Sequence, residues 1–181
     1  FKADLLERGS FNAAAKGCNI VFHTASPFLF KFNDPVKDLI NPAFEGTKNV
    51  LEAVNVTDSV ERVVLTSSCA AIYGDADECE YAPNNTLTEA IWNNTSSPSH
   101  QPYSYSKTIA EREAWKLADA QMRWSLVVIN PPVVLGPTVS GKSTSASHEL
   151  CLHIGDGTMK SGAPPFEVGM VDVRVVADAH K

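Results

Sequence analysis

The sequence predicts an α/β fold built on a parallel sheet that helices cover on both faces. Three apolar segments, residues 19–25, 62–66 and 125–130, have the continuous hydrophobic character of buried parallel strands. Two longer segments with helical spacing of their apolar residues separate these strands. Strands that alternate with helices are typical of βαβ units, and such units produce a parallel sheet.

The first predicted helix begins at Asp34-Pro35, where a capping carboxylate precedes a proline that suits the first helical turn. Apolar residues then recur every three or four positions as far as Val54, which indicates a helix of about 20 residues. A second helix is predicted over residues 104–120. Residues 75–102 are rich in Asn, Ser and Pro, which indicates a loop inserted into one domain. We therefore predict a single domain over residues 1–181.

Composition and charge exclude several classes of function. The chain of 181 residues is 44% hydrophobic and 20% charged, as is usual for a globular protein. Its net charge of −6, without a block of Lys or Arg, argues against a nucleic-acid or membrane partner. The four cysteines form no C-x-x-C pair and the five histidines show no metal-ligand spacing, so we expect no disulfide framework and no metal site. No signal peptide is recognised, and a cytoplasmic location is expected.

Polar residues follow the carboxyl ends of the predicted strands, the edge at which parallel sheets bind ligands. Ser68 follows the second strand, while Tyr103 and Lys107 stand four residues apart at the start of the second helix and share one face. An ammonium beside a phenol favours the phenolate, which predicts a lowered pKa for Tyr103 and a role as general acid or base. Ser68 would stabilise charge on the same substrate oxygen. Taken singly, these residues also fit an exposed helix start and a serine that caps the backbone.

In combination, Thr66-Ser67-Ser68 and the later Tyr103-Ser-Tyr-Ser-Lys107 resemble the Ser/Tyr/Lys triad of the extended short-chain dehydrogenase/reductases. Within the NAD-dependent epimerase/dehydratase superfamily, six blocks are similar in order and spacing to the dihydroflavonol, cinnamoyl-CoA and methylglyoxal (ketone) reductases. These blocks are residues 21–28, 39–53, 59–74, 103–115, 129–137 and 171–180. The resemblance implies a doubly wound, Rossmann-type NAD(P)-binding fold. It also implies an enzyme that reduces a ketone or aldehyde to an alcohol with NADP(H), in preference to NAD(H).

The resemblance further implies a role for each matched residue. Tyr103 is expected to donate the proton, Lys107 to bind the nicotinamide ribose and lower the pKa of Tyr103, and Ser68 to orient the substrate carbonyl. Contacts with the adenine, the cofactor ribose and the carboxamide are implied for Asp4, Leu5, Thr24, Ala25, Ser26, Pro131 and Val134. Three aromatic residues after the first strand are candidates for lining the substrate pocket, although such residues also pack in loops: Phe28, Phe30 and Phe32.

The sequence departs from the family pattern at three points. No G-x-x-G-x-x-G loop is found, so we expect an internal fragment that lacks the first two βα units and the C-terminal substrate region. Gln101-Pro102-Tyr103-Ser104 replaces the N-W-Y-C signature for CoA thioesters, which argues against a cinnamoyl-CoA substrate. Val175 replaces an Asp of the D-V-R-D-V-A pattern, and we expect a helix-start role to be lost there.

Three other functions stay open alongside the reduction of a small carbonyl substrate. A nucleotide-sugar epimerase or dehydratase uses the same triad with tightly held NAD. Gly136 to Ser143 matches the P-loop pattern G-x-x-x-x-G-K-[ST], whose backbone N–H groups cradle phosphates. Pro131-Pro132 interrupt the preceding strand, which argues against a P-loop nucleotide-binding protein because a P-loop springs directly from a strand. The third alternative is a non-catalytic binding protein that keeps the fold.

Overall fold

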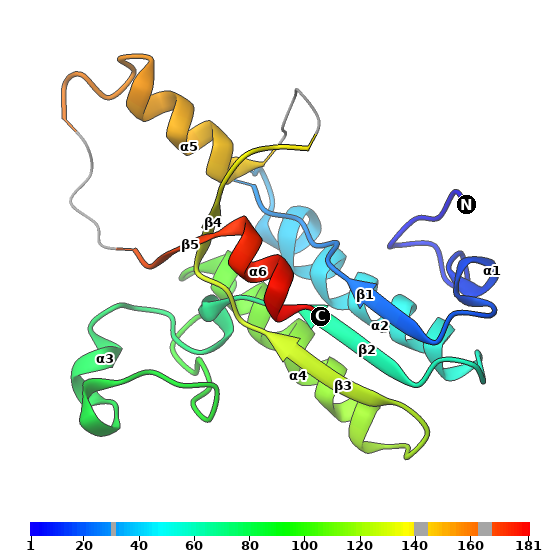
Figure 1. Ribbon diagram of the computed structural model, residues 1–181. Helices are drawn as coiled ribbons and strands as arrows, with labels where there is room; N and C mark the ends of the chain where they lie inside the picture. The colour runs from blue at the N-terminus through cyan, green and yellow to red at the C-terminus, as the bar shows by residue number, and fades with distance from the viewer. Residues whose placement is uncertain (30–31, 140–144, 163–167) are drawn as a thin grey trace.

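The computed structural model describes residues 1–29, 32–139, 145–162 and 168–181. Its elements are α1 (Asn12–Ala15), β1 (Ile20–His23), the π-helix η1 (Val36–Ile40), α2 (Asn41–Asn55), β2 (Arg62–Thr66), the 3-10 helix η2 (Cys69–Ala71), α3 (Glu78–Tyr81), the 3-10 helix η3 (Pro83–Asn85), α4 (Pro102–Asp119), β3 (Ser125–Ile129), β4 (Val133–Leu135), α5 (Ala146–Gly155), β5 (Met170–Asp172) and α6 (Val173–Ala179). In Figure 1, α2 and α4 lie together on one side of the sheet, and α5 projects away from it.

The main sheet has three parallel strands in the order β1-β2-β3, and β4 and β5 form a second parallel pair. The parallel sheet and the Rossmann-type fold predicted from the sequence are therefore confirmed. β2 has the predicted bounds, and β3 ends one residue before the predicted end. β1 is shorter than predicted, because Thr24 and Ala25 leave the sheet after His23.

The hydrophobic core lies between this sheet and the pair of helices α2 and α4. Each Leu or Val side chain that is fully buried there stabilises the fold by about 1.5–3 kcal/mol relative to an exposed one. The core cluster consists of Leu51, Val54, Val60, Val63, Leu65, Ala114, Ala118 and Trp124. The apolar runs that predicted the strands and helices thus meet in one layer.

The opposite face of the sheet is covered much less than the sequence predicts. Ile20, Phe22 and Val127 on that face are 49%, 53% and 38% exposed. The crossovers through α2 and α4 run in the same direction across the sheet, and right-handed crossovers of one direction put both helices on the same face. In the part of the chain that the structure describes, α6 is the one helix that lies over the second face. Directly after α6, His180 Nε2 lies 2.7 Å from Thr66 Oγ1. The prediction of cover on both faces therefore holds only near this end of β2.

The helix that begins after Asp34 has the predicted cap. The Asp34 carboxylate accepts hydrogen bonds from the backbone N–H groups of Val36 at 2.9 Å and Lys37 at 3.2 Å. The first turns form a π-helix, which continues directly into α2. The cap and the two segments together confirm the predicted helix of about 20 residues.

Helix α4 begins at Pro102, two residues before the predicted start. Proline suits this position because the N–H that it lacks would have no partner within the helix. The preceding Gln101 has a positive φ of 55°, and its Nε2 donates to Asp75 Oδ1 at 2.7 Å. Asp75 Oδ2 also lies 2.8 Å from His100 Nε2. These contacts fix the turn that leads into α4.

The C-terminal end of α2 is closed by Arg123, which lies in the loop before β3. A helix end leaves carbonyl oxygens without partners inside the helix. The Arg123 guanidinium donates to four carbonyl oxygens at distances between 2.7 and 3.3 Å, those of Val54, Asn55, Thr57 and Val60. The adjacent Trp124 Nε1 donates to Asn55 Oδ1 at 2.8 Å. The start of β3 is thereby tied to the end of α2.

Helix α6 keeps an N-cap although Val175 replaces the expected Asp. Asp172 Oδ1 accepts from the backbone N–H of Arg174 at 2.8 Å, and its carboxylate also binds the Arg174 guanidinium. This side-chain contact holds the pKa of Asp172 down, at about 2. The helix start is thus capped by Asp172, the first Asp of the pattern, and the expected loss of a role at position 175 stays a prediction.

Side-chain hydrogen bonds fold the segment between η2 and α4. Asn93, which is 3% exposed, donates from Nδ2 to Ala70 O at 2.9 Å. Asn93 Oδ1 accepts from the N–H groups of Thr95 and Ser96. Glu78 Oε1 accepts from the N–H groups of Gly74 and Asp75. The inserted loop is thus packed against η2, directly after Ser68.

Three expectations drawn from composition concern thiols, metals and membranes. All four cysteines are free thiols, namely Cys18, Cys69, Cys79 and Cys151. Within the described ranges, no group of three or more His, Cys, Asp and Glu side chains is arranged to hold a metal ion. None of the helices in those ranges combines the length and apolar character needed to cross a bilayer.

Candidate active site

A cavity of about 450 Å³ lies at the carboxyl ends of the strands of the main sheet. Its wall combines the end of β2 and the start of η2 with the first turns of α4 and the segment between β3 and β4. Eight residues that the sequence singled out line it: Thr24, Ser26, Phe28, Ser68, Tyr103, Lys107, Pro131 and Val134. The edge at which parallel sheets bind ligands is therefore the edge at which these residues meet.

Ser68 is held by the turn that leads from β2 into η2. Its backbone is extended, with φ −161°, and its Oγ accepts from the N–H of Ala70 at 3.2 Å. The preceding N–H of Ser67 donates to Ile129 O, and the following N–H of Cys69 donates to Pro131 O. Ser68 is thus fixed between β2 and the segment after β3, and it also caps η2.

Tyr103 lies in the second position of α4 and packs against Phe28. The two ring centroids are 4.8 Å apart and the rings are tilted by 46°. Burial raises the pKa of Tyr103 above its usual value, and a hydrogen bond with the Ser68 side chain opposes part of this rise. The lowered pKa predicted from the sequence is therefore wrong for this structure, because burial outweighs the other effects on the phenol.

Lys107 is 6% exposed, and its Nζ donates to Thr66 O at 3.2 Å. Burial lowers its pKa to about 8, and the charge of Glu111 opposes this change. The buried His23 has a pKa lowered to about 4, first by burial and then by the charge of Lys107. At neutral pH the cavity wall therefore carries the Lys107 ammonium, while the buried His23 imidazole, which does not line the cavity, is neutral.

The residues of this cavity fit the nicotinamide end of NADP(H), the cofactor that the family resemblance implies. Ser67 Oγ is fully buried and has no hydrogen-bond partner among the described residues. Ser67 lines the same cavity as Lys107. A buried hydroxyl without a partner costs about 1–3 kcal/mol, so a bound group with polar edges would relieve this cost. A ribose with its hydroxyls beside Ser67 and the Lys107 ammonium meets this requirement.

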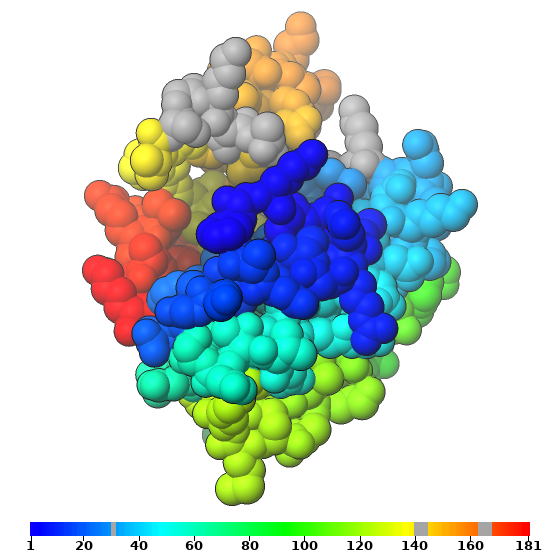
Figure 2. Space-filling view, turned by 90° about the vertical axis from the view of Figure 1, so that its right-hand side faces the viewer, coloured from blue at the N-terminus to red at the C-terminus, as the bar shows by residue number. Residues whose placement is uncertain are grey.

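Not every predicted cofactor residue lies at this cavity. Ala25 is adjacent to lining residues without lining the cavity itself. Asp4 and Leu5 lie beside α2, where Asn49 Nδ2 donates to Leu5 O at 2.6 Å. A Cβ at Gly46 would lie 3.1 Å from Leu5 Cβ, so this close approach favours glycine. Figure 2 shows the N-terminal segment in the middle of one face of the molecule, between α5 and α4.

The three phenylalanines proposed for the substrate pocket have different outcomes. Phe28 lines the cavity and contacts Tyr103. Phe32 is 39% exposed and does not line it. Phe30 lies outside the described residues. Only the first of the three is therefore placed at the cavity.

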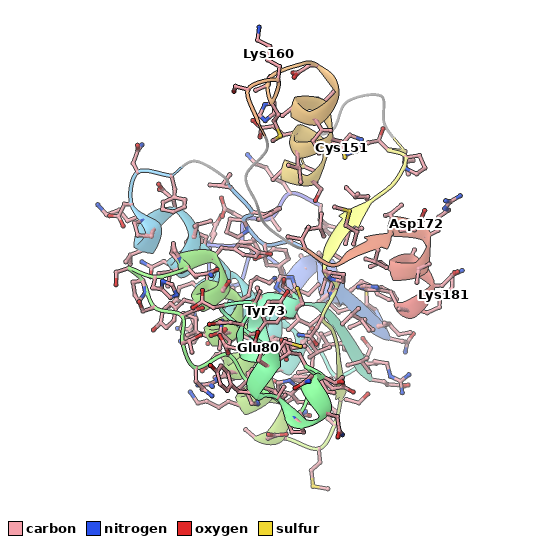
Figure 3. All side chains as sticks on the ribbon, turned by 90° about the vertical axis from the view of Figure 1, so that its left-hand side faces the viewer. Tyr73, Glu80, Cys151, Lys160, Asp172 and Lys181 are labelled. Carbon is pink, nitrogen blue, oxygen red and sulfur yellow. The ribbon has the colours of Figure 1, made fainter. Side chains whose placement is uncertain are left out.

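Several lining residues were not singled out from the sequence. Cys69 follows Ser68 directly, and Val168 comes from the segment before β5. Ser147 and Leu150 come from α5. Figure 3 shows this helix, with Cys151, and the segment after it, with Lys160, projecting from the rest of the chain. Apolar spacing over 146–150 was the available signal for α5, but spacing alone does not show which helix reaches a cavity.

The segment that matches a P-loop pattern begins at Gly136. Pro131 and Pro132 separate β3 from β4, as predicted, but β4 then leads directly into this glycine, so the interruption does not by itself argue against a P-loop. Gly136 has φ 152°, and a Cβ there would clash with Val173 Cγ1. This close approach to α6 explains the glycine without a phosphate. Gly141, Lys142 and Ser143 lie outside the described residues.

Comparisons with known proteins agree with this arrangement. A family model described as "Male sterility protein" matches residues 5–180. The chain is 40% identical over 183 residues to cinnamoyl-CoA reductase CAD2 of Medicago truncatula, which is 99% of this chain and 54% of the relative. It is 35% identical over 182 residues to the NADPH-dependent methylglyoxal reductase GRE2 of Saccharomyces cerevisiae, which is 94% of this chain and 53% of that protein. The chain spans about half the length of the curated relatives it matches.

Solved structures give the same result. The crystal structure of the yeast methylglyoxal/isovaleraldehyde reductase Gre2 complexed with NADPH matches with a TM-score of 0.78 and 32% identity, over 98% of this chain and 56% of that one. A UDP-glucose 4-epimerase of Thermus thermophilus in complex with NAD matches with a TM-score of 0.70 and 24% identity, and so shares the fold. On these matches and the motifs at the cavity, the chain belongs to the extended short-chain dehydrogenase/reductase family, in the group matched by the male sterility protein model.

Proposed function

We propose that this chain forms the catalytic core of an NADP(H)-dependent reductase that converts a ketone or an aldehyde to an alcohol. The observation that carries the proposal is that Ser68, Tyr103 and Lys107 line one cavity at the carboxyl edge of the sheet. NADPH is the cofactor named for the yeast relative GRE2, which supports NADP(H) over NAD(H) for this chain.

The proposed chemistry requires a proton for the carbonyl oxygen when the carbonyl carbon is reduced. Bound NADP(H) would supply the hydride. Tyr103 is the proposed proton donor, because its raised pKa keeps the hydroxyl protonated near neutral pH. Ser68, which lines the same cavity as Tyr103, would donate to the same oxygen and stabilise its developing charge. The Lys107 ammonium would stabilise the phenolate left after the proton transfer.

The resemblance assigns the cofactor to residues around the same cavity. Lys107 would hold the nicotinamide ribose, Thr24 and Ser26 would lie beside it, and the backbone at Pro131 and Val134 would hold the carboxamide. All five residues line the cavity. Asp4, Leu5 and Ala25 remain proposed cofactor residues outside it.

The wall of the cavity favours a neutral carbonyl substrate. Apolar side chains form much of this wall, among them Phe28, Pro132, Val133, Leu150 and Val168. Lys107 is the one cationic side chain on the wall within the described residues. A nucleoside diphosphate or a CoA thioester carries several negative charges and is bound most often by Arg and Lys. The site therefore supports reduction of a small ketone or aldehyde over epimerisation of a nucleotide sugar.

The test is an assay of the complete protein that contains this chain. NADPH and NADH consumption would be followed with neutral ketones and aldehydes, with cinnamoyl-CoA and UDP-glucose as comparators, and alcohol products would be identified by mass spectrometry. We expect neutral carbonyls to be reduced and NADPH to be preferred. Turnover of UDP-glucose without reduction of any carbonyl would contradict the proposal.

The P-loop alternative has its own test at Lys142. In a P-loop this lysine contacts the outer phosphates, a charge-assisted contact worth about 1.5–3 kcal/mol. ATP and NADPH would be titrated calorimetrically into the wild type and into Lys142→Ala. We expect NADPH binding in both and no ATP binding in either. ATP binding that falls more than tenfold in Lys142→Ala, without NADPH binding, would overturn the reductase proposal.

A further inference from the structure

Glu111 is a buried carboxylate that the sequence analysis did not single out. It is 7% exposed and lies on α4, one turn after Lys107. Burial of a carboxylate is costly unless polar partners are present. Asn130 Nδ2 donates to Glu111 Oε2 at 2.8 Å, and Trp115 Nε1 donates to Oε1 at 3.4 Å. The carboxylate is therefore held by two neutral donors, one of which comes from the end of β3.

The charge of Glu111 acts on Lys107. Burial lowers the pKa of the Lys107 ammonium to about 8, and Glu111 is the group whose charge opposes this. Two ionisable groups near Lys107 are neutral near pH 7: His23 on β1 has a pKa of about 4, and burial raises the pKa of Tyr103 on α4. Cys69 of η2 lines the same cavity as Lys107. Glu111 is thus the negative charge that balances a buried ammonium.

The same carboxylate is linked to Ser68 through Asn130. The Asn130 side-chain amide donates one hydrogen bond to Glu111 Oε2 at 2.8 Å and another to Ser68 O at 3.1 Å. An amide NH₂ has two donors, and both are used here. A continuous chain of contacts therefore runs from α4 through the end of β3 to the backbone of Ser68.

We propose that Glu111 is a positioning residue for the Ser/Tyr/Lys group, which keeps Lys107 in its ammonium form and holds the backbone of Ser68 through Asn130. Its kinetic consequences rest on the proposed reductase function. Glu111 itself does not line the cavity, so it acts through the residues that do.

The decisive variant is Glu111→Gln, which removes the charge and keeps an oxygen that Asn130 can reach. Without the carboxylate, Lys107 loses its proton at lower pH, so the basic limb of the profile of kcat/KM against pH is expected to move down by about one pH unit. Glu111→Asp keeps the charge on a shorter side chain and is expected to lie between the wild type and Glu111→Gln. A purely structural role for Glu111 would lower activity without moving this limb.

A matched control lies two residues further along α4. The Glu113 side chain is 11% exposed and its carboxylate pairs with Lys116 at 3.0 Å, away from the cavity. Glu113→Gln is expected to leave the pH profile unchanged.

Asn130→Ala tests the hydrogen bonds through Asn130, since it frees the Ser68 carbonyl oxygen and keeps the charge of Glu111. We expect about a tenfold lower kcat at every pH in Asn130→Ala, with the basic limb unmoved.

A measurement that needs no turnover separates this inference from the proposed function. The titration of Lys107 Nζ would be followed by NMR in protein labelled with ¹⁵N-lysine. We expect its pKa to be lower in Glu111→Gln than in the wild type, even if no carbonyl is reduced. An equal Nζ pKa in the two folded proteins would overturn the inference. If Glu111→Gln does not fold, Glu111→Ala decides, because it also removes the charge, and an Nζ pKa equal to that of the wild type in this folded variant would overturn the inference.

Discussion

The two halves of helix α4 have opposite relations to the rest of the molecule. The N-terminal half carries Tyr103 and Lys107, which line the cavity, and Glu111 follows directly at the middle of the helix. The C-terminal half carries Ala114 and Ala118, which lie in the core cluster that the sheet and α2 complete. In Figure 1 the helix runs along the sheet, so one rigid element connects the core with the candidate site. The comparison shows that apolar packing at one end of the helix holds in place the polar groups at the other end, whose burial is unfavourable.

The changed pKa values of three buried groups show that burying polar side chains near the cavity is unfavourable. Burial is the largest cause of the lowered pKa values of Lys107 and His23 and of the raised pKa of Tyr103. Each of these changes disfavours the charged form and therefore marks a group that water would solvate better. Apolar burial in the other half offsets this cost. Substitutions at the cavity should therefore change mainly the catalytic rate. Substitutions in the core should change mainly the stability of the fold.

The largest expected effect is that of Tyr103→Phe in the complete protein. The change removes only the hydroxyl that we propose as proton donor, so kcat/KM for carbonyl reduction should fall by about 10²–10⁴-fold. The melting temperature should stay close to that of the wild type. Tyr105→Phe on the same helix is the control, because Tyr105 does not line the cavity. Full turnover in Tyr103→Phe would remove this residue from the mechanism.

The opposite outcome is expected for Leu51→Ala in the core. Leu51 is 1% exposed within the core cluster, so its truncation should lower the free energy of unfolding by about 2–5 kcal/mol, measured by urea denaturation. The kinetic constants of the remaining folded enzyme should be nearly unchanged. Val56→Ala, at a side chain that is 68% exposed, should change stability by no more than about 0.5 kcal/mol. A comparable loss in both variants would contradict the assignment of the core.

A stability change with pH is expected from His23, a buried residue of β1 whose pKa is also lowered by the charge of Lys107. Its Nε2 is 3.3 Å from Thr47 Oγ1, and its pKa is lowered to about 4. As pH falls below about 6.5, the unfolded chain takes up a proton that the folded chain refuses until about pH 4. The free energy of unfolding should therefore fall by about 2 kcal/mol from pH 8 to pH 5 through this group. His23→Gln should lose that part of the pH dependence, and an unchanged dependence would contradict the burial of a neutral imidazole.

The smallest expected effect is that of Arg123→Gln at the end of α2. The variant loses most of the donors that satisfy four carbonyl oxygens, but water can reach this partly exposed site. We expect the free energy of unfolding to fall by about 1–2 kcal/mol, with no change in catalytic rate. Arg8→Gln, which breaks an exposed pair with Glu52, should cost less than about 1 kcal/mol. Equal losses in the two variants would show that the carbonyl contacts of Arg123 add nothing.

Local sequence patterns predicted most of the fold. The runs at 62–66 and 125–130 became β2 and β3, and the cap at Asp34 opened the first long helix. The spacing of Tyr103 and Lys107 correctly placed both side chains at one cavity. These successes have one reason: strand character, capping and helical spacing depend on neighbours in the sequence.

By itself, then, the sequence determined the three strands of the main sheet, the two long helical segments and the strand ends at which Ser68, Tyr103 and Lys107 lie. It did not predict the strand pair β4 and β5. Only the tertiary structure decided how strongly each group is buried, and so it reversed the predicted direction of the pKa change at Tyr103. It also decided that α2 and α4 share one face, and that Glu111 and Asn130 meet behind the site. Burial and contacts between distant residues depend on how the elements pack, and periodicity within one element does not specify that packing.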